Sequence, residues 1–282
     1  MPDVVGNLSW PWHLGPALFT VMAWWGATGL IAWLIGKPPS SYRLTLFGSS
    51  IVAVISLGMI VLLAAESTAL SAWLSFSAAL ALWGWIEVTF LTGTITGPHR
   101  PRHTPREGFA HARDAIRAIL WHELVIITTI ALCAWLTGSA TNRTALFTLL
   151  LLWIMRSSAK LNLFLGVRNL GEVFLPRHLQ HLLGFLRHRQ MNLLFPFSLI
   201  LGSALTWQLT MTAIQATDIF VATSFSMLAT LSALAMLEHM LMILPIPAEV
   251  LWRWSLRNRD DNGHTLAVSA ETRECSAQGV KS

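Results

Sequence analysis

The chain has 282 residues, of which 54% are hydrophobic and only 12% are charged, and its formal net charge is +5. Soluble domains carry about twice this charged fraction, so the composition excludes an ordinary soluble protein and predicts a polytopic helical membrane protein. The 14 tryptophans against a single tyrosine agree with this prediction, because indole rings favour the boundary between membrane and water.

Seven apolar runs are long enough to cross a hydrocarbon core, which takes about 20 residues. Each run is expected to be helical, because a span has to satisfy its own backbone hydrogen bonds in lipid. The expected spans are 14–36, 44–65, 70–92, 116–137, 144–165, 193–215 and 221–244. They predict one all-α transmembrane bundle over residues 1–257, followed by a polar, disordered tail over 258–282.

The distribution of basic residues predicts the orientation of this bundle. Lysine and arginine are concentrated in the connections after the first, third and fifth spans and after the last one, whereas the other side holds Arg143 alone. Basic connections stay in the cytoplasm, so we expect a periplasmic N-terminus and a cytoplasmic C-terminus. The positive net charge is then a topology signal and does not indicate a nucleic-acid partner.

Two of the cytoplasmic connections are expected to meet the membrane surface. The loop 93–115 is basic and rich in proline and histidine, which favours contact with anionic headgroups. In the segment 172–190, leucines recur along one helical face, which predicts an amphipathic helix lying in the interface. A partner-binding helix would show the same pattern. Its lipid- or partner-facing basic residues are Arg177, His178, His181, Arg187 and Arg189.

Several charged and imidazole side chains fall inside the expected spans. A helix rises 1.5 Å per residue, and on this scale all of them lie in one layer of the cytoplasmic half of the membrane. Such groups are costly in lipid and usually pair inside a bundle. The predicted cluster consists of Glu87, His122, Glu123, Arg156, Lys160, Glu238 and His239.

Three functions of this cluster are compatible with the sequence. It can be a paired network that fixes the register of the helices. It can be a pigment or metal site with His122 and His239 as ligands, since imidazoles bind metals and a neighbouring carboxylate can orient them. It can also be a proton or substrate path, although the spans lack the paired interruptions of many transporters. The pattern favours the first function and leaves the identity of any metal open.

The segment LWIMRSSAKLNLFLGVRNLGEVFLPRHLQHL (152–182), followed by RQMNLLFP (189–196), resembles the PuhE-type photosynthetic complex assembly proteins of purple phototrophic bacteria. The segments WHEL (121–124) and LEHMLMILPIPAEVLWRW (237–254) are similar to the same family. The resemblance extends over most of the chain from the third span onward, whereas the first two spans and the tail carry little of it.

The resemblance implies a multi-pass protein of the bacterial inner, intracytoplasmic photosynthetic membrane. Members of that family are encoded with the reaction-centre H subunit and are thought to help assemble the reaction centre and core antenna, or to modulate bacteriochlorophyll supply. We therefore expect a non-enzymatic assembly factor or accessory subunit that contacts reaction-centre and core-antenna polypeptides and membrane lipids, with bacteriochlorophyll as a candidate cofactor. The alternative is a membrane metalloenzyme of tetrapyrrole or carotenoid metabolism with a Glu/His metal site.

Overall fold

The computed structural model describes residues 10–98, 108–245, 248–252 and 254–255. Within these ranges seven α-helices are long and apolar enough to cross a membrane, which confirms the predicted all-helical transmembrane fold. They are α1 Gly15–Ile35, α2 Tyr42–Leu62, α3 Ala69–Leu91, α4 Gly108–Thr137, α5 Thr144–Leu165, α6 Leu194–Gln215 and α7 Ile219–Leu241. Short helical turns lie between them at Pro39–Ser41, Glu172–Phe174 and Arg177–Phe185, before α1 at Trp10–Leu14 and after α7 at Ala248–Trp252.

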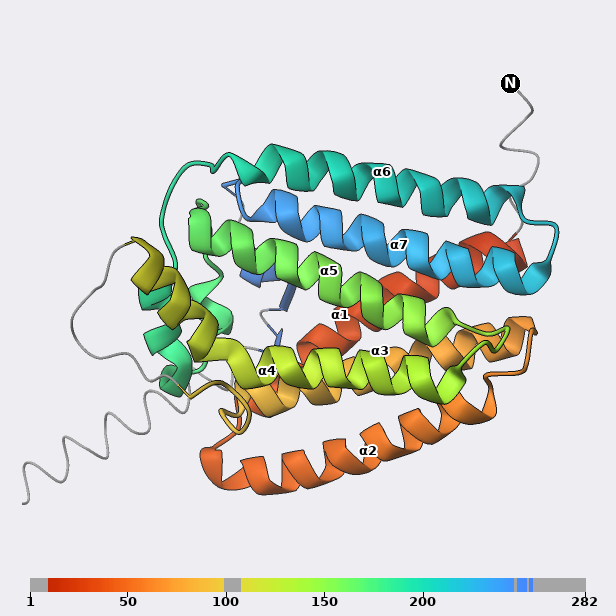
Figure 1. Cartoon of the computed structure of the whole chain (residues 1–282), viewed down its shortest axis with the longest axis horizontal. Helices are drawn as coiled ribbons and strands as arrows, with labels where there is room; N and C mark the ends of the chain where they lie inside the picture. The colour runs from red at the N-terminus through yellow and green to blue at the C-terminus, as the bar shows by residue number, and fades with distance from the viewer. Residues whose placement is uncertain (1–9, 99–107, 246–247, 253, 256–282) are drawn as a thin grey trace, which may run out of the picture.

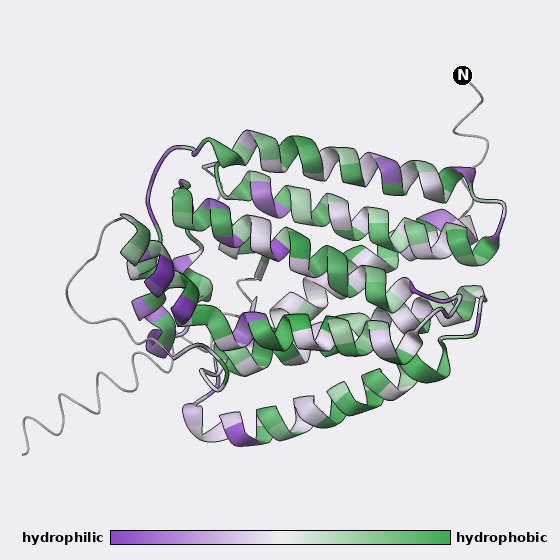
Figure 2. Ribbon diagram, viewed as in Figure 1, coloured by the Kyte–Doolittle hydropathy of each residue, from purple (hydrophilic) through white to green (hydrophobic). Residues whose placement is uncertain are grey.

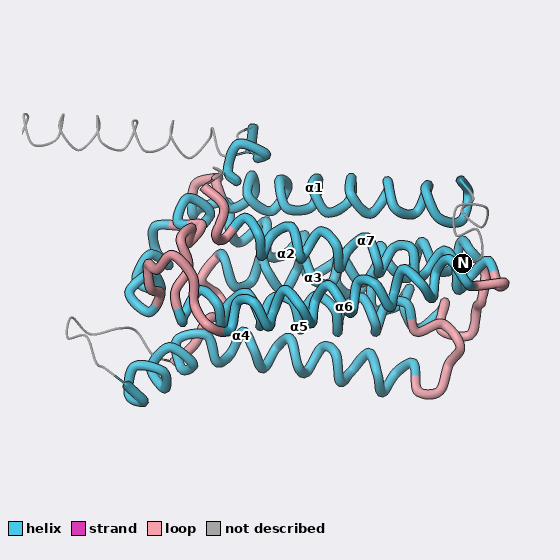
Figure 3. The backbone as a smooth tube through the Cα atoms, turned by 90° about the horizontal axis from the view of Figure 1, so that it is seen from above, coloured by secondary structure: helices cyan, strands magenta, loops and turns pink. Residues whose placement is uncertain are grey.

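Helices α3 and α7 form the centre of the bundle (Figure 1). Both are the most extensively buried of the seven, and they contact each other as well as α1 and α5. Helix α2 packs on α3, and α6 packs on α7. Seen from above, α1 lies along one face of the bundle and α4 along the opposite face (Figure 3). Central helices therefore have protein neighbours on several sides, while the outer helices expose apolar side chains along their length.

Hydrophilic residues gather at one end of the bundle (Figure 2). This end carries the turn Arg177–Phe185 and the first turns of α4, and we call it the basic end. Its exposed cations include Arg43, Arg113, Arg117, Arg168, Arg177, Arg187 and Arg189. These seven described residues, which the sequence assigned to one side of the membrane, thus lie at one end of the structure.

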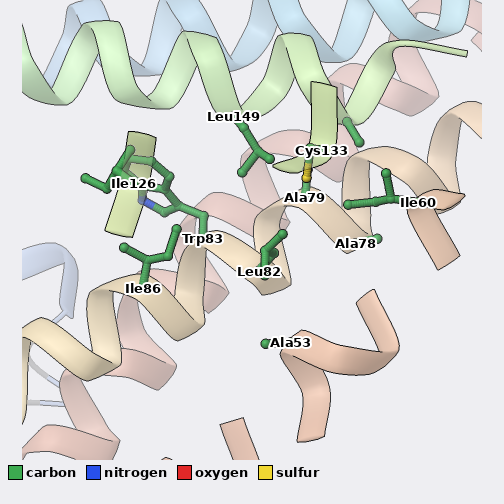
Figure 4. Packing of buried hydrophobic residues seen from close by; sticks show 11 residues of the cluster. Ala53, Ile60, Ala78, Ala79, Leu82, Trp83, Ile86, Ile126, Cys133 and Leu149 are labelled. Carbon is green, nitrogen blue, oxygen red and sulfur yellow. The ribbon is translucent and has the colours of Figure 1, made fainter. Parts of the chain in front are cut away.

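Two apolar clusters hold the helices together. In the first, side chains of α2, α3, α4 and α5 meet, with Ile86, Ile126 and Leu149 fully buried (Figure 4). The second joins α3, α5 and α7 around Phe76 and Met227. In lipid, close van der Waals packing rather than transfer from water drives this association.

Specific residues determine where the central helices begin and end. Thr68 and Ser71 form a reciprocal capping box at the start of α3. The carboxylate of Asp218 accepts hydrogen bonds from two backbone N–H groups at the start of α7. Helix α5 ends at Gly166, whose φ of 121° is unfavourable for a residue with a Cβ.

Helix α4 begins at Gly108, eight residues before the expected start of its span at residue 116. Its 30 residues correspond to about 45 Å, which exceeds a hydrocarbon core of about 30 Å. The first turns run obliquely to the rest of the helix (Figure 1). Within α4, the peptide N–H of His122 donates to the carbonyl of Thr96 at 3.0 Å. An acceptor from outside the helix is a recognised cause of bending.

The segment 172–190 differs from the single amphipathic α-helix that we expected. It forms two 3₁₀ helices, Glu172–Phe174 and Arg177–Phe185, and then continues as extended chain. A 3₁₀ helix has three residues per turn, so its inward face repeats at every third position. Leu179 and Phe185 are accordingly buried and Leu182 is partly buried. The leucine spacing had suggested a period of 3.6, and with that period the inward position would have been Leu186.

A charged layer inside the bundle as the candidate functional site

An ion pair joins α3 to α5 within the membrane-spanning part of the bundle. The guanidinium Nη2 of Arg156 lies 3.5 Å from Oε2 of Glu87. The Glu87 side chain is only 9% exposed, whereas that of Arg156 is 47% exposed. The carboxylate therefore depends on this arginine for compensation of its charge, and the arginine also has an outlet at the surface of the bundle.

A second ion pair joins α4 to α5 one helical turn away. The ammonium of Lys160 donates to Oε1 of Glu123 at 2.5 Å, and both side chains are about a quarter exposed, at 24% and 23%. Arg156 and Lys160 are four residues apart, so they share a face of α5. From that face each cation pairs with an acid on a different neighbouring helix, which connects α3, α4 and α5.

His122 lies between these two ion pairs but makes no ion pair itself. Its side chain is 1% exposed, and its ring lies against Phe90 with centroids 4.3 Å apart. It is close enough to Glu87, Lys160, Glu123 and Arg156 to interact with their charges. Among the described residues, its buried Nδ1 atom has no hydrogen-bond partner. His122 therefore acts as a packed aromatic ring in the middle of the charged network.

Glu238 and His239 connect the layer to two further helices. The indole N–H of Trp24 on α1 donates to Oε1 of Glu238 at 2.7 Å, and Glu238 is near enough to Arg156 for electrostatic attraction. His239 is 1% exposed. Its Nδ1 is 2.8 Å from the carbonyl of Ala235 and its Nε2 is 3.0 Å from the hydroxyl of Ser158. Because a carbonyl can only accept, Nδ1 carries a proton. Both nitrogens of His239 are thus used in protein contacts.

This geometry does not form a metal centre among the residues that the structure describes. No group of three or more His, Cys, Asp or Glu side chains there converges on a position that could hold a metal ion. The acids face cations or an indole instead, and the two histidines face different neighbours. The donor set required by the expected metalloenzyme is therefore not assembled.

The two candidate pigment ligands, His122 and His239, are both buried. An imidazole that ligates the magnesium of a chlorin needs an open face about as large as the macrocycle. His122 and His239 are each only 1% exposed, and Phe90 and Ser158 occupy the space beside their rings.

The predicted lipid- or partner-facing basic residues lie at the basic end, outside the charged layer. Arg177, His178, His181, Arg187 and Arg189 are all exposed. The segment is nevertheless attached to the bundle: Nε2 of His178 lies 3.0 Å from the Leu91 carbonyl, and the chain at Arg187–Arg189 exchanges hydrogen bonds with Leu163 and Val167. Two of its apolar side chains, Leu179 and Phe185, are consequently buried in the protein. We call residues 172–189 the basic cap.

Sequence reasoning missed several residues that position the layer. Trp24 was interpreted only as one of many membrane aromatics, yet it donates to Glu238. Ser158, between the two cations on α5, was not recognised as the partner of His239. Gly97 was also missed: it approaches α4 so closely that a Cβ there would lie 2.0 Å from the Arg117 carbonyl. Of these residues, Ser158 could have been recognised from the sequence as a member of the layer, because it lies two residues after Arg156 and two before Lys160.

The chain was compared with known proteins. A family model described as "Protein of unknown function (DUF3623)" matches residues 12–263. The chain is also 37% identical over 267 residues to a Rhodobacter capsulatus protein named "Uncharacterized 30.4 kDa protein in puhA 5'region", and the alignment covers 91% of this chain and 95% of the relative. No solved structure matches the chain.

Proposed function

The chain belongs to the DUF3623 family, and from this premise we propose that it is an integral membrane assembly factor or accessory subunit of the bacterial photosynthetic reaction centre and core antenna. The observation that carries the proposal is the near full-length match to a protein whose name locates it in the puhA 5' region. The resemblance described above associates that location with the reaction-centre H subunit. Seven helices able to span a membrane agree with a protein that meets these complexes within the bilayer.

We further propose that the charged layer is a clamp between helices, with no catalytic role. Its ion pairs and hydrogen bonds connect α1, α3, α4, α5 and α7. Opposite charges that are satisfied in one register become unpaired when a helix rotates or shifts. Such networks contribute specificity of packing more readily than net stability. A clamp of this kind would keep the outer helices in the arrangement that a partner recognises.

The proposal includes the orientation of the protein in the membrane and the part of the partner that each of its surfaces contacts. The basic end faces the cytoplasm, in agreement with the positive-inside rule, and the N-terminus faces the periplasm. The basic cap, whose apolar face is already used by the bundle, offers its exposed cations to acidic cytoplasmic parts of a reaction-centre or antenna polypeptide. The outer apolar helices contact the membrane-spanning parts of the same complexes. We propose that any effect on bacteriochlorophyll supply acts through these contacts.

A deletion strain tests the function. A phototrophic host that lacks its own copy of the gene should accumulate less reaction centre and core antenna, measured by near-infrared absorbance per cell, and this chain should restore them. Affinity capture from mildly solubilised membranes should recover reaction-centre or core-antenna polypeptides, identified by mass spectrometry. Unchanged absorbance in the deletion strain, together with capture of neither class of polypeptide, would refute the proposal.

The test of the clamp uses the same strain. Arg156→Met should lower both the amount of folded protein and the restored absorbance, whereas Arg143→Gln at the opposite end should lower neither. A variant of Arg156 that is folded and abundant but fails to restore absorbance would show that the layer has a direct role beyond clamping. Metal that is stoichiometric in purified protein and lost on Glu123→Gln would instead support the metalloenzyme.

A further inference from the structure

The first turns of α4, residues 108–117, have one face docked on the bundle. We call this stretch the α4 lead segment. The ring of His111 stacks on Phe164, with centroids 5.4 Å apart and planes at 24°, and it also contacts Phe185 of the basic cap at 5.6 Å. Asp114 on the same side is only 6% exposed. The lead segment is therefore held in place by α5 and by the basic cap.

The opposite face of the lead segment combines large apolar side chains with arginines. Phe109 is 85% exposed and Ile116 is 61% exposed. Arg113 and Arg117 are exposed as well. These four residues are separated by four, three and one positions, so they lie on one helical face. A face of this composition is unfavourable in water because of Phe109 and Ile116, and unfavourable in a hydrocarbon core because of the arginines.

Helix length places this face at the level of the lipid headgroups. The 20 residues from 118 to 137 span about 30 Å, which fills a hydrocarbon core without the lead segment. The first turns of α4 run obliquely to the rest of the helix, so the lead segment is turned away from the direction of the span (Figure 1). Its exposed face continues into the outward side of the span, where Trp121, Leu124 and Ile127 are 50%, 43% and 46% exposed. The surface is thus continuous with the part of α4 that faces lipid.

We propose that the α4 lead segment is an interfacial helix that binds anionic lipid. Phe109 and Ile116 insert among the acyl chains, and Arg113 and Arg117 bind lipid phosphates of the leaflet at the basic end. This inference does not depend on the proposed role in photosynthesis. It agrees with the headgroup contact that the sequence suggested for the loop 93–115, and it assigns that contact to the helical residues 108–117.

Spin labels at defined depths test the position of this face. The labels are attached to Phe109→Cys, Ile116→Cys and, as a control in the basic cap, His181→Cys, in full-length protein carrying Cys133→Ala and Cys275→Ser. The protein is reconstituted in nanodiscs that contain phosphatidylglycerol and phosphatidylcholine. Labels at 109 and 116 should be more accessible to oxygen than to a water-soluble nickel chelate, and the label at 181 should show the reverse order. Equal access of the chelate to all three positions would overturn the proposal.

Charge substitutions test the requirement for anionic lipid. With the label at 116, the ratio of oxygen to chelate accessibility should fall severalfold in phosphatidylcholine alone, or when Arg113→Gln and Arg117→Gln are combined. A matched pair in the basic cap, Arg177→Gln with Arg187→Gln, should leave it unchanged. If both pairs of substitutions lowered this accessibility ratio equally, the protein would be responding to its net charge. That result would overturn a lipid site at Arg113 and Arg117. Labels shielded from both reagents in native membranes, but exposed to the chelate in nanodiscs, would overturn it in favour of a protein partner. Thermal unfolding of each variant checks that the fold is kept.

Discussion

For the ion pair between Glu87 and Arg156, we predict that removing one partner destabilises the protein more than removing the other. Replacing Arg156 by methionine should destabilise the protein more than replacing Glu87 by glutamine, although both changes break the same contact. The reason is the difference in burial, because the acid is 9% exposed and the arginine is 47% exposed. Whichever partner remains has to find another environment, and the half-exposed arginine reaches the surface of the bundle more readily than the buried acid does.

The expected magnitudes follow from this geometry. At 3.5 Å and an effective dielectric constant of 20, the Coulomb attraction is about 5 kcal/mol, most of which desolvation offsets. Without Arg156 the buried Glu87 keeps an uncompensated charge or takes up a proton, and we expect a loss of about 3 kcal/mol. Without Glu87 the arginine can turn toward Glu238 and the surface, and we expect a loss of about 1 kcal/mol.

A double-mutant cycle provides the assay. The free energy of unfolding is measured by denaturant titration in mixed micelles, followed by circular dichroism, for both single variants and for their combination. The double variant should be more stable than Arg156→Met by about 2 kcal/mol, because it no longer contains a buried acid without a partner. Equal losses in the two single variants, or simple additivity in the double variant, would refute the reasoning from burial.

Three further predictions concern the packing and capping of the helices, and each is read by thermal unfolding in mild detergent. Gly97→Ala should lower the unfolding temperature, since its Cβ would lie 2.0 Å from a backbone carbonyl that cannot move aside, whereas Gly58→Ala, with nothing within 4 Å, should be neutral or stabilising. His239→Leu should cost about 2 kcal/mol, and adding Ser158→Ala should cost little more, because the two side chains share one hydrogen bond. Asp218→Ala should cost about 1 kcal/mol through loss of the N-cap of α7, and Asp218→Asn should restore most of it.

Most of the fold was predictable from the sequence because lipid restricts the choice of structure. A run such as 144–165 has no alternative to a spanning helix, and α5 occupies those residues in the structure. The start of α4 was not predictable in this way. Residues 108–115 are polar enough to resemble a loop, and they are helical because His111 docks on Phe164 and Phe185. Contacts of this kind depend on elements that are distant in the sequence.

The basic cap shows a second limit of sequence reasoning. Leucines at 175, 179, 182 and 186 fit a helical period of 3.6, and inward positions at 179, 182 and 185 fit a period of three. Nine residues are too few to separate the two periods. The choice depends on whether the apolar face meets lipid or protein, and in the structure it meets protein.

For the charged layer, the depth of each residue was predictable but its pairing was not. Counting residues from the helix ends selected Glu87, Glu123, Arg156 and Lys160 as neighbours in depth. Which acid meets which cation depends on the rotation of α3 and α4 about their axes, and the apolar clusters determine that rotation. The same limit explains why His122 and His239 were considered as ligands. Sequence cannot show that Phe90 and Ser158 fill the space beside them.

The two ends of the bundle are joined by different chemistry, and this difference bears on function. Away from the basic end, neutral groups connect the helices: the Asn142 amide donates to Ser75, and the Thr144 and Ser224 hydroxyls lie 2.9 Å apart. Nearer the basic end, neutral hydrogen bonds such as that from the Asn162 amide to Ser198 are joined by the two ion pairs. Neutral hydrogen bonds tolerate small shifts, whereas buried charges penalise any register that separates them. The basic end also carries the basic cap and the α4 lead segment, so the most strictly specified packing underlies the surfaces that we assign to partner polypeptides and lipid.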